Sequence, residues 1–173
     1  MTIDWGPRLV GQLEFYWDAH LWPRIQGLTD DEYLWEPVNG CWSIHPGADG
    51  TWTADDAWPP PDPAPVTTIA WRMQHIAIGC FADRARLFFD IGGDDSLPAT
   101  ADGGLTFLDD TYHRWHDAIA ALDSSGIDAP LGERGGPFAE EPMGELILHI
   151  NREVMHHSAE IALLRDLYRA KFS

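Results

Sequence analysis

A glutamate and a histidine lie four residues apart near the end of the chain, at Glu153 and His157. In a helix, residues at this spacing lie one above the other on the same face. Carboxylate and imidazole side chains both bind divalent metal ions, and a third ligand from another helix would complete a site. His75, in the middle of a second helical segment, is the best candidate for that ligand.

The surroundings of this pair indicate which way it faces. Glu153 and His157 interrupt an apolar stripe, and a buried carboxylate is costly unless it is paired or bound to a metal. The residues alone leave three interpretations open: a metal site, a buried Glu–His hydrogen bond, or a solvent-facing Glu153 paired with His149 or Arg152. The stripe itself consists of Leu146, Ile150, Glu153, His157, Ile161, Leu164 and Tyr168.

Four further residues are candidates for the surroundings of the site. His149 lies one turn before Glu153 and could hydrogen-bond to it. His156 and Glu160 fall on a more polar face, where we favour a solvated position over metal binding for His156. His20 lies on the apolar side of the first predicted helix, and we favour a core histidine with a backbone partner there.

Helical patterns account for most of the chain. Periodicity, caps and breakers predict long helices over about 7–26, 67–89, 105–122 and 140–170, with a short helix after the Thr29 capping box. No strand pattern of convincing length is present. We therefore predict an all-α fold, a four-helix bundle formed by a single domain over residues 1–173.

A long segment rich in proline, glycine and tryptophan separates the first two long helices. Its proline and glycine density between residues 37 and 65 excludes a long helix. A loop of this length is usually functional or flexible. Trp42, Trp52 and Trp58 indicate that parts of it pack down, and we expect them to help wall a substrate pocket.

The bulk composition excludes several classes of partner. With 28 acidic and 11 basic residues, the formal charge of −17 disfavours nucleic acid and anionic membrane surfaces. We find no apolar run of membrane-spanning length and no signal-peptide pattern, and we expect a cytoplasmic protein. Cys41 and Cys80 are too few for a disulfide framework. Nine Trp and seven Phe residues permit a homodimer without establishing one.

Two sets of residues match a known pattern over nearly the whole chain, and on them the chain resembles an actinobacterial branch of the DinB/YfiT-like superfamily of metalloenzymes. The first set is Gln12, Leu13, Trp17, Pro23, Arg24, Gly27, Leu28, Thr29, Glu32, Trp35, Glu36, Pro37, Cys41 and Trp42. The second, more specific set is Glu153, Val154, His156, His157, Ala159, Glu160, Ile161, Leu164, Arg165, Asp166, Leu167 and Tyr168.

The resemblance implies a four-helix bundle with three metal ligands, one on the second long helix and two on the last. His75 and His157 match two of the usual histidines, and Glu153 stands where the third usually is. This His, Glu and His set is similar to that of the mycothiol-dependent maleylpyruvate isomerase branch. The resemblance therefore favours the metal interpretation, with Zn, Ni, Fe and Mn all compatible with the ligands.

The resemblance also implies thiol chemistry on a small-molecule substrate. Relatives use mycothiol, bacillithiol or glutathione, and the metal is thought to lower the thiol's pKa. We expect a metal-dependent thiol transferase or isomerase acting on a small electrophile. Because the sequence stops after the fourth predicted helix, we expect no C-terminal domain of the maleylpyruvate isomerase type, which argues against that particular activity. The alternatives are a non-catalytic metal- or small-ligand-binding protein, and a metal-dependent hydrolase with Glu160 or His156 as base.

Overall fold

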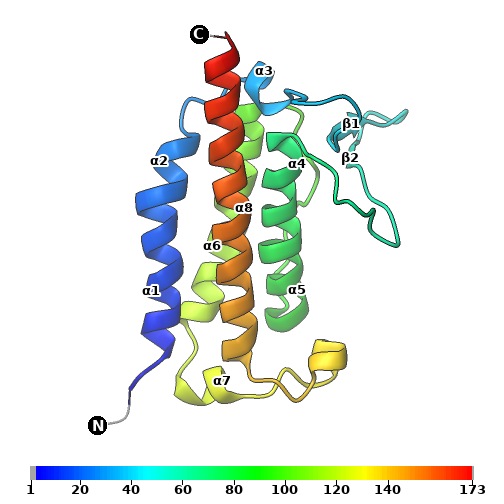
Figure 1. Cartoon of the computed structure of the whole chain (residues 1–173). Helices are drawn as coiled ribbons and strands as arrows, with labels where there is room; N and C mark the ends of the chain where they lie inside the picture. The colour runs from blue at the N-terminus through cyan, green and yellow to red at the C-terminus, as the bar shows by residue number, and fades with distance from the viewer. Residues whose placement is uncertain (1–2, 173) are drawn as a thin grey trace.

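Four long helical stretches lie side by side in the computed structural model, which describes residues 3–172 (Figure 1). The all-α prediction is confirmed, because the only sheet among these residues is a pair of three-residue strands. The first stretch is α1 (Gly6–Tyr16), the π-helical η1 (Trp17–Leu21) and α2 (Trp22–Ile25). The second is α4 (Ile69–Gln74), the π-helical η2 (His75–Ala82) and α5 (Asp83–Phe89). The third and fourth are α6 (Ala101–Ala120) and α8 (Met143–Phe172).

The third stretch begins earlier than the predicted residue 105. Thr100 caps α6, where its hydroxyl accepts a hydrogen bond from the Gly103 amide at 3.2 Å. Gly103 and Gly104 lie in the first turn of α6, and two consecutive glycines do not indicate a helix in the sequence. Gly104 allows close packing, since a Cβ there would lie 2.9 Å from the hydroxyl oxygen of Tyr33.

Short elements connect the long helices. The helix predicted after Thr29 is α3, and the Thr29 hydroxyl accepts from the Glu32 amide at 3.3 Å. The hairpin of β1 and β2 was not predicted, because three residues are too few to show an alternating pattern. The other short elements are α3 (Asp30–Tyr33), β1 (Ile44–Pro46), β2 (Trp52–Ala54), α7 (Ser124–Asp128) and the 3₁₀ helix η3 (Gly132–Phe138).

The core fills the space between the long helices. His20 was predicted to lie in this core, and the structure shows that it does not. The inner face of the first stretch follows Leu13, Trp17, Leu21 and Ile25 at four-residue spacing, and all four are buried. His20 lies outside this line and is exposed to solvent. Its ring packs against the rings of Phe15 and Tyr16, which lie on the same helical stretch. His20 is therefore neither a core histidine nor part of the predicted site.

The segment between the first two stretches packs against the second in part. The Trp42 backbone pairs with the residues before α4, through hydrogen bonds of 2.8 Å to the Val66 carbonyl and from the Thr68 amide. Trp52 is half-buried against the core. Trp58 is 92% exposed, so the expectation that it walls a pocket is wrong. Among the described residues, no helix combines the length and apolar character needed to cross a membrane.

Candidate metal centre

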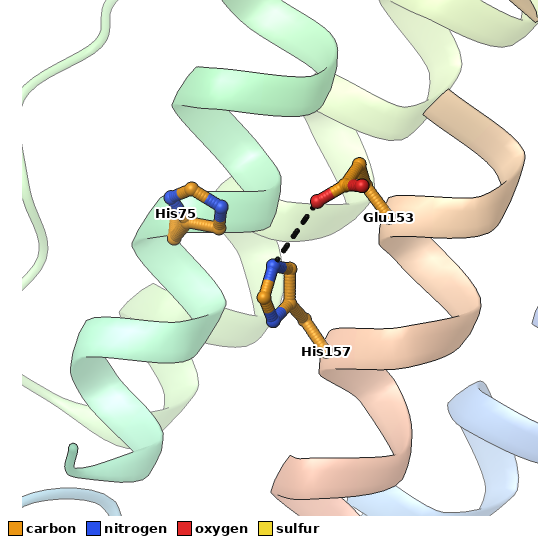
Figure 2. Close-up of side chains that lie close together, drawn as sticks. All are labelled: His75, Glu153 and His157. Atoms are coloured by element: carbon orange, nitrogen blue, oxygen red, sulfur yellow. Dashed lines mark ion pairs between the residues drawn. The ribbon is translucent and has the colours of Figure 1, made fainter. Parts of the chain in front are cut away.

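Three side chains converge between η2 and α8, as Figure 2 shows. Each of His75, Glu153 and His157 offers one ligand atom, and these atoms lie within 4.8 Å of one another. His157 Nε2 is 3.4 Å from Glu153 Oε2. The imidazole rings of His75 and His157 meet edge to face, with centroids 4.7 Å apart. The structure thus brings together the three residues that the sequence singles out as metal ligands.

The position of the cluster in the fold makes it reachable from solvent. His157 is buried, whereas His75 and Glu153 are half-buried. On the second helical stretch, Ile76 and Cys80 follow His75 and are almost fully buried in the core. The cluster therefore lies at the edge of the core, where a bound ion would keep positions open to small molecules.

Glu160 determines which nitrogen of His157 faces the cluster. Its Oε2 accepts a hydrogen bond from His157 Nδ1 at 2.7 Å. Arg72 Nε lies 2.7 Å from the same oxygen and holds the carboxylate in place. With the proton on Nδ1, the lone pair of Nε2 points toward Glu153, and this is the tautomer that a metal ligand requires.

A second group of possible ligands, His156, His157 and Glu160, overlaps the first. It is a poorer site, because Glu160 already accepts from His157 and pairs with the Arg72 guanidinium. The His156 side chain is 66% exposed, and its Nε2 lies 3.7 Å from Glu160 Oε1. His156 therefore takes the solvated position that the sequence favours.

Burial holds His75 in its neutral form. Desolvation, together with the nearby His157 and Arg72, lowers the pKa of His75 to about 4. The Trp71 indole stacks on the imidazole, with ring centroids 5.2 Å apart and planes 9° apart. At neutral pH, His75 can therefore offer an unprotonated nitrogen to a cation.

Glu153 combines features of the buried and the solvent-facing interpretations. Its side chain is 29% exposed, and its Oε1 is 3.8 Å from His149 Nδ1 and 3.9 Å from Arg152 Nε. Both distances are too long for hydrogen bonds, so the predicted His149–Glu153 hydrogen bond does not form. Instead, His149 Nδ1 accepts from Arg152 Nη2 at 2.7 Å.

Trp42 reaches the cluster only through Trp71. Their rings are 5.5 Å apart, and the Trp71 Nε1–H donates to the Asp55 backbone carbonyl at 2.8 Å.

The sequence did not reveal the roles of Trp71 and Arg72 beside the cluster. Trp71 precedes His75 by one helical turn, a spacing that could have revealed it. The sequence holds no signal for Arg72, because its partner Glu160 comes from α8.

A cavity of about 500 Å³ lies between η3 and the N-terminal part of α8, and none of the three candidate ligands lines it. His149 and Arg152 line it, and their Nδ1 and Nε atoms lie 3.8 and 3.9 Å from Glu153 Oε1. Leu131 and Phe138 supply an apolar wall opposite them. A volume of this size accommodates a small organic molecule.

The sequence matches a known protein family over most of its length. A family model described as the DinB superfamily matches residues 12–161. No curated protein and no solved structure matches the chain significantly.

Proposed function

The chain belongs to the DinB superfamily, and from that membership and the His–Glu–His cluster we propose that it is a divalent-metal-dependent enzyme on a DinB/YfiT-like four-helix bundle. Its ligands are His75, Glu153 and His157. Its reaction is the transfer or isomerisation of a small electrophile with a low-molecular-weight thiol of the mycothiol type. The observation that carries the proposal is the convergence of the three ligand atoms within 4.8 Å.

The residues fit a divalent ion in three respects. His157 has its Nδ1 proton engaged by Glu160, which leaves Nε2 free. His75 has a pKa lowered to about 4, chiefly by burial, and is neutral. Glu153 adds the negative charge that offsets part of the ion's charge. Two imidazoles and one carboxylate with open positions suit Zn, Ni, Fe or Mn.

The protein's own cysteines argue for an external thiol. Burial raises the pKa of Cys80 to about 12, and the charge of Glu153 adds to the rise. The pKa of Cys41 is also raised, first by burial and then by Glu36. Neither side chain supplies a thiolate near neutral pH. A divalent ion at the cluster would lower the pKa of a thiol bound to it, as metal ions do for bound water and thiols.

The remaining residues hold and orient the reactants. Arg72 and Glu160 hold the His157 ring, so its Nε2 is already directed at the cluster before a ligand binds. The cavity beside Glu153 offers Phe138 to the apolar part of an electrophile and Arg152 to a polar or anionic group. A small-molecule substrate and a cytoplasmic location belong to the proposal, and the formal charge of −17 disfavours nucleic acid as a partner. A homodimer stays a prediction.

Two alternatives make different demands on the site. A hydrolase would need Glu160 or His156 as base, but Glu160 Oε2 is engaged by both His157 and Arg72. His156 is exposed on the polar face of α8, and its Nε2 lies 3.7 Å from Glu160 Oε1. A non-catalytic binding protein would need only the metal ligands.

Metal content and product analysis test the proposal. We expect purified protein to bind one divalent ion per chain by mass spectrometry, His157→Ala to lose it, and the control His156→Ala to keep it. Loaded protein should form an S-conjugate from an electrophile only when a low-molecular-weight thiol is added. Hydrolysis without thiol would establish the hydrolase instead, and a bound ion without turnover would establish the binding protein. Equal metal content in all three proteins would refute the ligand assignment.

A further inference from the structure

A groove of about 680 Å³ follows the C-terminal half of α8. Its other residues come from the segments that follow α3 and lead into α4, two helices that lie near the C-terminal end of α8 in Figure 1. Arg72 and Glu160 line it nearest the metal cluster, and Trp35 and Lys171 line it near the end of α8. None of the three proposed metal ligands lines it. The groove meets the candidate metal site only through Arg72 and Glu160, which orient His157, and a ligand bound in the groove does not depend on the proposed thiol chemistry.

The walls of the groove are apolar and uncovered. Val38 and Val66 form one side, with exposed fractions of 49% and 47%. Leu163 and Leu167 form the other, with exposed fractions of 58% and 47%. These are four of the twelve large apolar side chains that are exposed in the described part of the chain. Covering them would contribute about 25 cal/mol for each Å² of apolar surface removed from water.

The charge of the groove is opposite to that of the whole chain. Lys171 is the only lysine in a chain of formal charge −17. Its ammonium group lies 5.4 Å from the Trp35 ring centroid, and within residues 3–172 it takes part in no ion pair with a carboxylate. Glu160 is the one acidic residue lining the groove, and Arg72 neutralises it. Within the described residues the Lys171 ammonium contacts only the Trp35 and Phe172 rings, so its N–H groups can donate to an anion.

We propose that this groove binds a free amphipathic carboxylate with a single unbranched aliphatic chain. The carboxylate pairs with Lys171, and the chain lies between the valine and leucine walls toward the Arg72–Glu160 pair. From Glu160 to Lys171 the helix rises about 16 Å, the length of a medium-chain fatty acid. A cation at one end and apolar walls along the rest select this amphipathic anion over a uniformly polar metabolite.

Calorimetric titration of the full chain with monomeric dodecanoate tests the inference. We expect saturable binding, and no binding of dodecyltrimethylammonium, which has the same chain and the opposite charge. Lys171→Met should weaken dodecanoate binding roughly fivefold, the effect of one exposed charge pair. The control Arg8→Met removes the same charge from an exposed site elsewhere and should have no effect. Leu163→Gln should also weaken binding, whereas Leu148→Gln, an exposed leucine outside the groove, should not.

Two further measurements separate this site from the metal chemistry and from self-association. The metal-ligand variant His157→Ala should bind dodecanoate like the wild type, whatever its activity with thiols. Analytical ultracentrifugation should show the same mass for wild type and Leu163→Gln. Equal affinity for the two detergents, equal effects of Lys171→Met and Arg8→Met, or a dimer lost in Leu163→Gln would each overturn the inference. The last result would identify a second copy of the chain as the occupant.

Discussion

The indole of Trp71 lies parallel to the imidazole of His75, one helical turn away, with ring centroids 5.2 Å apart. Trp71 is itself held from the loop side, because its Nε1–H donates to the Asp55 carbonyl at 2.8 Å and its ring contacts Trp42. The proline-rich segment therefore reaches the candidate metal site through the ring of Trp71, which contacts His75. We predict that this contact helps to orient His75, a proposed metal ligand.

Replacing Trp71 tests this orienting role. Trp71→Leu removes both the stacked ring and the N–H donor, and we expect metal affinity to fall roughly tenfold, as for other groups that orient ligands. Trp71→Phe keeps a ring and should recover part of the affinity. Competition with a chelating indicator gives the affinity, and the visible spectrum of the cobalt-loaded protein reports the ligand geometry. The exposed Trp5→Leu is the control, and a spectrum unchanged in Trp71→Leu would exclude the orienting role.

Glu160 should affect metal binding without contacting the metal. It accepts the Nδ1 proton of His157 at 2.7 Å, so Glu160→Ala frees the ring to rotate or change tautomer. We expect a loss of metal affinity between about tenfold and a hundredfold in Glu160→Ala. Glu160→Gln, which keeps an acceptor oxygen, should lose less. Calorimetric titration measures both, with His156→Ala as the neighbouring control. Affinities equal to the wild type in both Glu160 variants would show that Glu160 does not orient His157.

The approach of Glu153, His157 and His75 to one another was predictable in part from helical spacing. Glu153 and His157 lie four apart on α8, and His75 falls on the half-buried stripe of the facing helix. Long-range partners were not predictable in the same way. Nothing in the sequence around Arg72 indicates that it pairs with Glu160, since that contact depends on how two helices pack.

The exposed position of His20 shows a different limit. A stripe through His20 and a stripe through Trp17 and Leu21 are both consistent with helical spacing, and only packing distinguishes them. Packing against α6 favours the stripe through Trp17, because the Tyr112 ring on α6 stacks on the Trp17 ring with centroids 3.9 Å apart. The π-helical η1 begins at Trp17, and no sequence rule predicts such a segment.

A buried ion pair should contribute more to stability than a surface pair on the same helix. Arg165 donates to both oxygens of Glu32, at 2.7 and 3.0 Å, and side-chain exposure is only 1% and 4%. Glu32→Gln leaves the guanidinium buried beside a neutral group, and we expect a loss of about 3 kcal/mol in unfolding free energy. Urea denaturation measures it. Asp166→Asn breaks the exposed pair with Arg24 and should cost about 0–1 kcal/mol. Similar losses in the two variants would contradict this ranking.

His116 should make the stability of the fold depend on pH. Burial by itself would lower the pKa of His116, but hydrogen bonds to Glu14 at 2.8 Å and Asp117 at 2.9 Å raise it overall. A raised folded-state pKa means that the protonated ring stabilises the protein below the unfolded pKa of about 6.5. That contribution is lost as pH rises through the folded pKa. We therefore expect His116→Gln to destabilise the protein more in mildly acidic than in alkaline urea titrations, with exposed His113→Gln as control. A loss that is the same at every pH would show that His116 acts only through packing.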